Sequence, residues 1–223
     1  MKCEKETMLL YAVTDRMWTG KQTLMEQVED ALKGGATCVQ LREKELDEEN
    51  FLKEAIEMKA LCAKYGVPFI VNDNVEIAIK CKADGIHVGQ SDMEAGNVRA
   101  LVGEDMIIGV STKNVEQALA AQKAGADYLG SGAIFGTSTK ADARPMTMET
   151  LNAICDCVDI PVVAIGGICL DNIGRLAGSH AAGAAIVSGI FGVPNIRETT
   201  EKLVKAMEEI TRLSGQDLRA GSV

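Results

Sequence analysis

Short apolar runs alternate along this chain with longer segments that carry apolar residues at helical spacing. Glycine or alanine recurs just before several runs, as in Lys33-Gly34-Gly35-Ala36, where small residues permit a tight helix-to-strand turn. The runs fall at residues 8–13, 37–41, 68–71, 85–88, 106–110, 126–129, 160–165 and 184–187. Eight strands, each followed by a helix, predict an α/β fold of the TIM-barrel, (β/α)8 type. An open doubly wound sheet is the alternative, although eight strands in 223 residues are many for it.

Capping residues mark where the helices should begin. Thr23 and Glu26 have the spacing of a capping box before a helix. Three further caps are predicted at Asp47, Asn114 and Thr147. No charge run or linker divides the chain, so we predict one barrel domain over residues 1–213 and a flexible tail over residues 214–223.

Composition limits the partners that this chain can bind. Its formal net charge of −9 repels nucleic acid and anionic membranes, so local donors must hold any phosphate ligand. We expect no signal peptide and no membrane-spanning segment. The seven cysteines are an odd number without framework spacing, which favours reduced thiols in a cytoplasmic protein.

Polar residues follow nearly every apolar run. In a TIM barrel the residues just past the strands share one face, where sites are built. The exits carry Gln40, Arg42 and Lys44; Asn72 and Asp73; Gln90 and Asp92; Ser111; Thr137, Thr139 and Lys140; Gly166 and Gly167; and Val187 and Ser188. Their convergence favours a functional site over scattered loop polarity.

Two groups of exits have the composition of anion sites. Residues 130–140 combine three glycines with three consecutive hydroxyl side chains and Lys140, which suit a phosphate, although such residues also form plain loops. Gly166-Gly167 and Ser188-Gly189 follow the last two runs, where TIM barrels often bind phosphate. Tight turns without a ligand are the alternative for these glycines.

Asp73 and Asp92 follow consecutive runs, so their carboxylates can meet at the barrel rim. Magnesium takes one or two carboxylates and completes its shell with water and substrate phosphates. A general acid/base pair and two turn-capping aspartates are the alternatives. The histidines indicate no catalytic pair, because His87 lies inside an apolar run and His180 precedes the last run.

Taken in order, these motifs resemble thiamine phosphate synthase over about residues 10–190. The matching pieces are Tyr11-Ala12-Val13-Thr14-Asp15, Val39-Gln40-Leu41-Arg42-Glu43-Lys44, Val71-Asn72-Asp73, Gly85-Ile86-His87-Val88-Gly89-Gln90-Ser91-Asp92, Gly109-Val110-Ser111, Thr137-Ser138-Thr139-Lys140, Ala164-Ile165-Gly166-Gly167-Ile168 and Val187-Ser188. Each piece is ordinary alone, but the ordered set is specific.

The resemblance implies an enzyme that transfers a hydroxymethylpyrimidine group from its diphosphate to the ring nitrogen of a thiazole phosphate. It implies that Gln40, Leu41, Arg42, Glu43, Lys44 and Asn72 bind the pyrimidine diphosphate, that Asp73 and Asp92 hold Mg2+, and that Ser111 and Lys140 also face the diphosphate. It assigns the thiazole phosphate to Thr137, Ser138, Thr139, Gly167, Val187 and Ser188. Arg42, Lys44, Ser111 and Lys140 are then the expected catalytic residues. The partners are small molecules, with no nucleic acid or membrane, and a homo-oligomer is possible.

This chain departs from the family at a few positions. Ala133 and Gly136 stand where the family usually has prolines, and Lys113 stands where a histidine is common. Alternative functions are another phosphate-binding barrel enzyme, such as an isomerase or the related thiazole tautomerase, and a non-catalytic sensor of thiamine precursors. Both alternatives are disfavoured by the retained set of Arg42, Lys44, Asp73, Asp92 and Lys140.

Overall fold

Eight parallel strands close into one barrel in the order of the chain, and β8 pairs with β1. The structure is a computed structural model that describes residues 3–89, 95–136 and 145–220. The strands are β1 (Leu10–Val13), β2 (Cys38–Leu41), β3 (Phe69–Asn72), β4 (Gly85–Val88), β5 (Ile107–Thr112), β6 (Tyr128–Gly132), β7 (Val162–Ile165) and β8 (Gly183–Ile186). The predicted (β/α)8 TIM barrel is confirmed.

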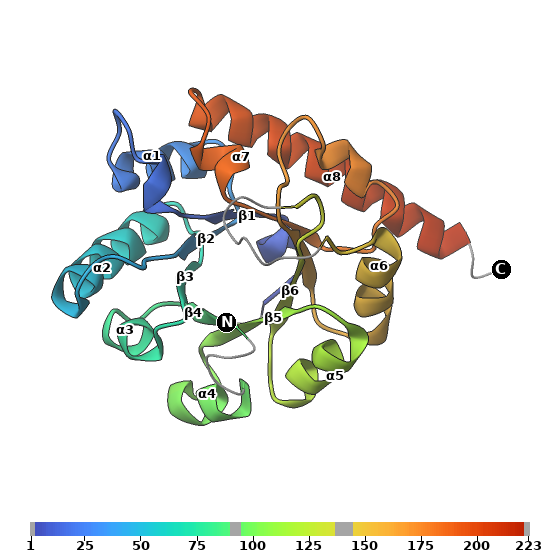
Figure 1. Cartoon of the computed structure of the whole chain (residues 1–223), viewed down its shortest axis with the longest axis horizontal. Coiled ribbons are helices and arrows are strands. Elements are labelled where there is room, and N and C mark those ends of the chain that lie inside the picture. The colour runs from blue at the N-terminus through green and yellow to red at the C-terminus, as the bar shows by residue number, and fades with distance from the viewer. Residues whose placement is uncertain (1–2, 90–94, 137–144, 221–223) are drawn as a thin grey trace.

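The helices form a ring around the strands, as Figure 1 shows. The α-helices are α1 (Leu24–Lys33), α2 (Glu48–Lys64), α3 (Val75–Lys80), α4 (Ala95–Val102), α5 (Val115–Lys123), α6 (Met148–Cys157), α7 (Ser188–Phe191) and α8 (Ile196–Ala220). The 3-10 helices are η1 (Glu6–Met8), η2 (Arg16–Trp18) and η3 (Ile173–Leu176). Parallel strands need such crossovers, and the helices therefore cover the outside of the sheet.

Each predicted capping residue caps the N-terminus of the helix that follows it. Thr23 and Glu26 form a full capping box, because the N–H of Glu26 donates to Thr23 Oγ1 at 3.3 Å and the N–H of Thr23 donates to Glu26 Oε2 at 2.8 Å. Side-chain oxygens of Asp47, Asn114 and Thr147 accept backbone N–H groups at the starts of α2, α5 and α6. Each cap satisfies a donor that has no partner inside its own helix.

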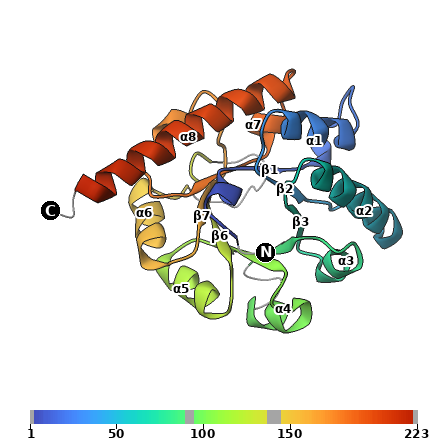
Figure 2. The same ribbon diagram turned by 180° about the vertical axis from the view of Figure 1, so that it is seen from behind.

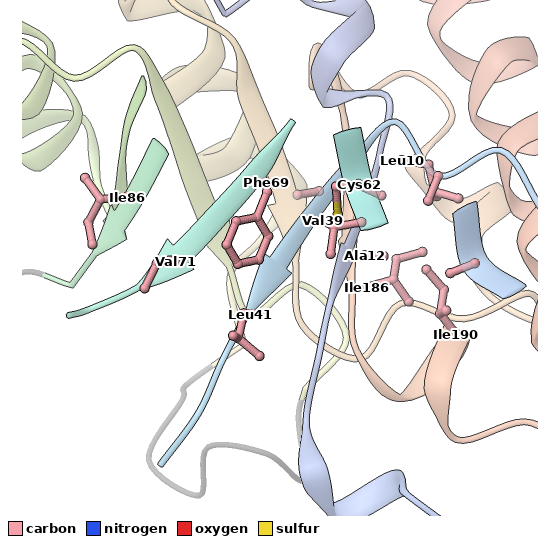
Figure 3. Packing of buried hydrophobic residues seen from close by; sticks show 14 of the residues in the cluster. Leu10, Ala12, Val39, Leu41, Cys62, Phe69, Val71, Ile86, Ile186 and Ile190 are labelled. Carbon is pink, nitrogen blue, oxygen red and sulfur yellow. The ribbon is translucent and has the colours of Figure 1, made fainter. Parts of the chain in front are cut away.

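Side chains alternate between two cores along every strand. Even positions of β2, such as Cys38, face the barrel interior, whereas Val39 and Leu41 face the helices. The outer core contains Leu41 with Phe69 and Val71, which Figure 3 shows beside one another. The inner core contains Met8, Tyr11, Val13, Cys38, Ile70, Ile107, Tyr128, Val163 and Ala185. This alternation decides which residues can reach a ligand inside the barrel.

The N-terminal segment closes the end of the barrel at which the strands begin. Figure 2 shows η1, in dark blue, over the centre of the ring. Met8 is completely buried in the inner core, and its backbone oxygen lies so close to Gly183 that a Cβ there would be 1.9 Å from it. The barrel is therefore filled at this end, which leaves the opposite end for ligands.

Two connections differ from the predicted pattern. The crossover from β7 to β8 contains η3 in place of an α-helix, and the short segment that forms it carries Gly174 and Gly178, which disfavour a regular helix. Helix α8 continues past Leu213, where the barrel domain was predicted to end, to Ala220. The single-domain boundary at residue 213 and the flexibility of the tail stay predictions.

No helix in the described part of the chain combines the length and the apolar content needed to cross a bilayer.

Candidate active site

One cavity of about 730 Å³ opens where the strands end. Every strand or its exit contributes to the lining, so the site belongs to the barrel as a whole. The predicted site residues in the lining are Gln40, Arg42, Lys44, Asn72, Asp73, Ser111, Gly167, Val187 and Ser188. Convergence of the strand exits is thus observed for these residues.

Side chains along β2 and its exit point alternately into the barrel and toward the helices, which explains why Leu41 and Glu43 do not line the cavity. Gln40, Arg42 and Lys44 share the inward face of β2 and its exit, while Leu41 faces the helices and is completely buried there. Glu43 also faces outward and is buried. Their predicted role in substrate binding stays untested, and their side chains lie away from the cavity.

Glu43 organises the loop between β2 and α2. Its Oε1 accepts the N–H groups of Lys44 at 2.7 Å and of Glu45 at 2.6 Å, and its Oε2 accepts two bonds from Arg16, at 2.6 and 2.9 Å. Burial alone would raise the pKa of Glu43, but the N–H groups and the Arg16 guanidinium outweigh it and lower that pKa. Glu43 therefore holds the backbone that presents Lys44.

Ion pairs fix the two cationic side chains of this wall. Arg42 Nη1 lies 2.6 Å from Asp15 Oδ2, and Lys44 Nζ lies 2.5 Å from Asp73 Oδ2. Asp15 is itself held, because its Oδ1 accepts the N–H of Met17 at 3.0 Å. The guanidinium and the ammonium are thus held at the cavity, where charge-assisted bonds to an anion are strong.

A chain of hydrogen bonds crosses the barrel interior beneath the cavity. Gln40 Nε2 donates to the Tyr11 hydroxyl at 2.7 Å, and the Tyr11 and Tyr128 hydroxyls are 2.8 Å apart. Tyr128 lies 2.9 Å from His87 Nδ1, and His87 Nε2 lies 2.9 Å from Ser111 Oγ. Burial raises the pKa of both tyrosines well above their usual range, so both hydroxyls keep their protons. The chain therefore links the orientation of Gln40 to that of Ser111.

Glycine at position 109 makes room for this chain. A Cβ at Gly109 would lie 2.1 Å from Tyr128 Cζ, so the Tyr128 ring occupies the space that any larger residue would need. The ring also packs edge-on against Tyr11, with the centroids 5.8 Å apart.

The opposite wall consists mainly of backbone. Gly167 has φ +66°, and a Cβ there would lie 2.1 Å from the Gly136 carbonyl oxygen. Asn172 holds this turn, because its Nδ2 donates to the Gly167 carbonyl at 2.8 Å and its Oδ1 accepts the N–H of Cys169 at 2.9 Å. Val187 and Ser188 line the cavity where β8 passes into α7. Small residues and backbone groups here can approach an anion closely.

Asp73 fits the predicted role of a magnesium ligand. It is the acidic residue among the described residues that line the cavity, and it adopts φ +63° just past β3. No group of three possible metal-ligating side chains occurs in the described residues. Magnesium does not need such a group, because one or two carboxylates with water and substrate phosphate complete its shell.

The remaining predicted site residues lie outside the described parts of the chain. They are Asp92, Thr137, Ser138, Thr139 and Lys140. Their assignments to metal, acceptor phosphate and leaving group stay predictions.

Sequence reasoning missed Tyr11 and Tyr128 and gave His87 no part in the site. His87 is buried and hydrogen-bonded at both ring nitrogens, and it also lines the cavity. The sequence did carry a signal for His87. Side chains alternate along a strand with a period of two, so His87 shares one strand face with Gly85 and with Gly89 at the strand exit.

Fold and cavity together define a TIM-barrel enzyme whose site suits anionic small molecules. A model of the family described as thiamine monophosphate synthase matches residues 10–190. The thiamine-phosphate synthase of Ruminiclostridium cellulolyticum is 48% identical over 196 residues, covering 88% of this chain and 93% of that protein. That of Alkaliphilus oremlandii is 49% identical over 194 residues, covering 87% and 93%. The structure of thiamine phosphate pyrophosphorylase from Pyrococcus furiosus superimposes with a TM-score of 0.86 at 37% identity, covering 92% of this chain and 98% of that one. This chain belongs to the thiamine monophosphate synthase family.

Proposed function

We propose that this protein joins the hydroxymethylpyrimidine group of a pyrimidine diphosphate to a thiazole phosphate, releasing thiamine phosphate and pyrophosphate. The observation that carries the proposal is a single cavity with two different walls. One wall presents Arg42 and Lys44, and the other presents the Gly166-Gly167 turn with Ser188. Each wall can bind one anionic group. One cavity with two such walls can therefore hold two phosphorylated substrates next to each other, as the reaction requires.

The cationic wall binds the pyrimidine diphosphate. Arg42 and Lys44 neutralise the diphosphate, and Gln40 and Asn72 line the same side of the cavity, where they contact the pyrimidine and its leaving group. Ser111 contributes a hydroxyl from β5, and we assign a further positive charge toward the diphosphate to Lys140, which follows β6 in the sequence. These residues act most strongly as the carbon–oxygen bond to the diphosphate lengthens, because negative charge then grows on the leaving group.

The backbone wall binds the acceptor. N–H groups near Gly167 and Ser188 donate to the thiazole phosphate, together with Thr137, Ser138 and Thr139. The phosphate holds the thiazole so that its ring nitrogen faces the pyrimidine carbon. That nitrogen carries no proton to remove, so the reaction needs no general base.

Asp73 and Asp92 would hold magnesium, which supplies charge neutralisation for the diphosphate when bound. Lys44 keeps the Asp73 carboxylate at the cavity through their ion pair. The bond to pyrophosphate breaks ahead of attack, which leaves a pyrimidine cation that the thiazole nitrogen captures. The bond electrons depart with the pyrophosphate, and the new carbon–nitrogen bond uses the lone pair of the ring nitrogen.

The proposal is tested by incubating the purified protein with both substrates and magnesium and measuring thiamine phosphate. We expect product with both substrates present, and none when either is omitted or when a chelator removes the metal. Absence of product from a protein that binds both ligands in calorimetry would contradict catalysis and favour the precursor sensor. Turnover of a thiazole alone would favour the tautomerase.

A cytoplasmic location and a possible homo-oligomer stay predictions from the sequence. The cysteines among the described residues are free thiols, which is compatible with that location.

A further inference from the structure

The positive charges around the cavity are not equally neutralised. Arg42, Lys44 and Lys113 are the described lining residues that carry a full positive charge. Arg42 is paired with Asp15 and Lys44 with Asp73. Within the described parts of the chain, the Lys113 ammonium has no carboxylate or other acceptor as a partner, and its side chain is exposed. Lys113 is therefore the described lining residue whose positive charge no described side chain neutralises.

The fold directs Lys113 toward the cavity. Ile107 belongs to the inner core, a Cβ at Gly109 would meet the inner-core Tyr128 ring, and Ser111 reaches His87 inside the barrel, so odd positions of β5 face inward. Lys113 continues this alternation one step past the strand, and it lines the cavity.

The Lys113 backbone is held at the start of α5, whereas no described residue pairs with its side chain. Its N–H donates to Gln117 Oε1 at 2.8 Å, and the N–H of Gln117 donates in turn to Asn114 Oδ1 at 2.8 Å. This reciprocal pair begins α5 and fixes where the Lys113 side chain starts. The ammonium then reaches the cavity by rotation of the side chain alone.

We propose that Lys113 binds the diphosphate of the pyrimidine substrate and the pyrophosphate product, an inference that rests on the proposed function. Lys113 shares the inward face of β5 with Ser111, on the side of the cavity assigned to the leaving group. The leaving diphosphate gains negative charge during the reaction, whereas the acceptor phosphate keeps its charge. A cation that no described carboxylate neutralises therefore stabilises the diphosphate more than it stabilises the acceptor.

The test compares Lys113→Gln with Lys53→Gln. Lys53 is exposed on α2 and is absent from the lining, so the control removes the same charge away from the cavity. Inorganic pyrophosphate, with magnesium present throughout, is titrated into each folded protein by calorimetry. Loss of one charge-assisted contact at an exposed position should weaken pyrophosphate binding by Lys113→Gln about tenfold, and added salt should shrink the difference. Lys53→Gln and Lys113→Arg should bind like the wild type.

Other outcomes separate this inference from the proposed function. Equal pyrophosphate affinity for Lys113→Gln and the wild type would overturn the role of Lys113, even if the wild type forms thiamine phosphate. A loss confined to thiazole phosphate would overturn the assignment to the diphosphate. A wild type that forms no thiamine phosphate would contradict the proposed function, and the pyrophosphate titration would still decide the role of Lys113. A thermal unfolding midpoint equal to that of the wild type is expected for Lys113→Gln, because the Lys113 side chain makes no hydrogen bond or ion pair with a residue that the structure describes.

Discussion

At the residue scale, the Tyr128 hydroxyl is the central link of the hydrogen-bond chain under the cavity. It joins Tyr11 at 2.8 Å to His87 at 2.9 Å, and the ring is completely buried. Because a buried polar group without a partner is costly, removal of this one oxygen affects two neighbours. The hydroxyl also determines whether His87 donates to Ser111 or accepts from it, since a neutral imidazole has one donor nitrogen and one acceptor nitrogen.

Tyr128→Phe should therefore lower the free energy of unfolding by about 1–3 kcal/mol, because His87 and Tyr11 lose a buried partner. Turnover should fall as well, because Gln40 and Ser111 lose their shared orientation. Tyr65→Phe is the matched control, since the Tyr65 hydroxyl bonds Glu29 at an exposed site and its loss should change stability by less than about 0.5 kcal/mol. Denaturant unfolding of both variants decides the point. Equal losses of unfolding free energy in the two variants would show that the buried chain of hydrogen bonds adds nothing to stability.

Two features of Gly167 disfavour a side chain there: its left-handed backbone conformation and the close approach of the Gly136 carbonyl oxygen. A comparison with a second glycine separates the two features. Gly178 also has positive φ, at +80°, but a Cβ there would meet nothing within 4 Å. Alanine at either position should cost about 1 kcal/mol in backbone strain. Gly167→Ala should lose more stability than Gly178→Ala and should bind thiazole phosphate at least about tenfold more weakly, because the turn must move away from Gly136. If the two variants lost the same thiazole phosphate affinity in calorimetry and the same stability in unfolding, this role for the Gly167 turn would be contradicted.

At the element scale, the Glu43 carboxylate and the Arg16 guanidinium together connect three segments of the chain. Arg16 in η2 binds it, and the same guanidinium binds Glu54 in α2 at 2.8 Å. The N–H groups that Glu43 accepts belong to the loop between β2 and α2. The Glu43–Arg16 pair thus ties the exits of β1 and β2 together, Arg16 extends the connection to α2 through Glu54, and Glu43 sets the position of Lys44.

Glu43→Gln should lower the free energy of unfolding near neutral pH by about 1–3 kcal/mol, since an amide cannot accept all these bonds. The pKa of Glu43 is lower in the folded than in the unfolded protein, so its contribution is complete above the unfolded pKa and disappears as the pH falls through the folded pKa. The difference between wild type and variant should therefore shrink below about pH 4. Glu201→Gln, which breaks an exposed pair with Arg197, should cost less than about 1 kcal/mol. A stability difference for Glu43→Gln that grows on acidification would contradict this account.

The sequence predicted elements better than it predicted side-chain directions. Caps such as Thr23 and Asp47 are local signals, and the helices begin where they indicated. Residues 40–44 were treated as one binding segment, although a strand sends alternate residues to opposite faces. Leu41 and Glu43 consequently face the helices. The contact between Tyr128 and His87 joins β6 to β4 across the barrel interior, and no pattern within a single strand reveals it.

At the scale of the whole molecule, barrel closure turns eight separate strand exits into one site. The alternation of eight strands with helices predicted this closure, because eight such units are the number in a TIM barrel. The closed barrel then places the cavity at one end, while η1 fills the other. The net charge of −9 makes the local cations decisive for binding phosphate. The overall fold was therefore predictable, whereas the pairs Arg42–Asp15 and Lys44–Asp73 join exits of different strands, which no pattern within one strand reveals.

The central claim is that both phosphorylated substrates react within this one cavity. The most direct measurement follows thiamine phosphate and pyrophosphate together during a single reaction of the purified wild-type protein with magnesium. We predict that the two products form in equal amounts and only while both substrates are present. Pyrophosphate released without thiamine phosphate, or no release of either product, would contradict the claim.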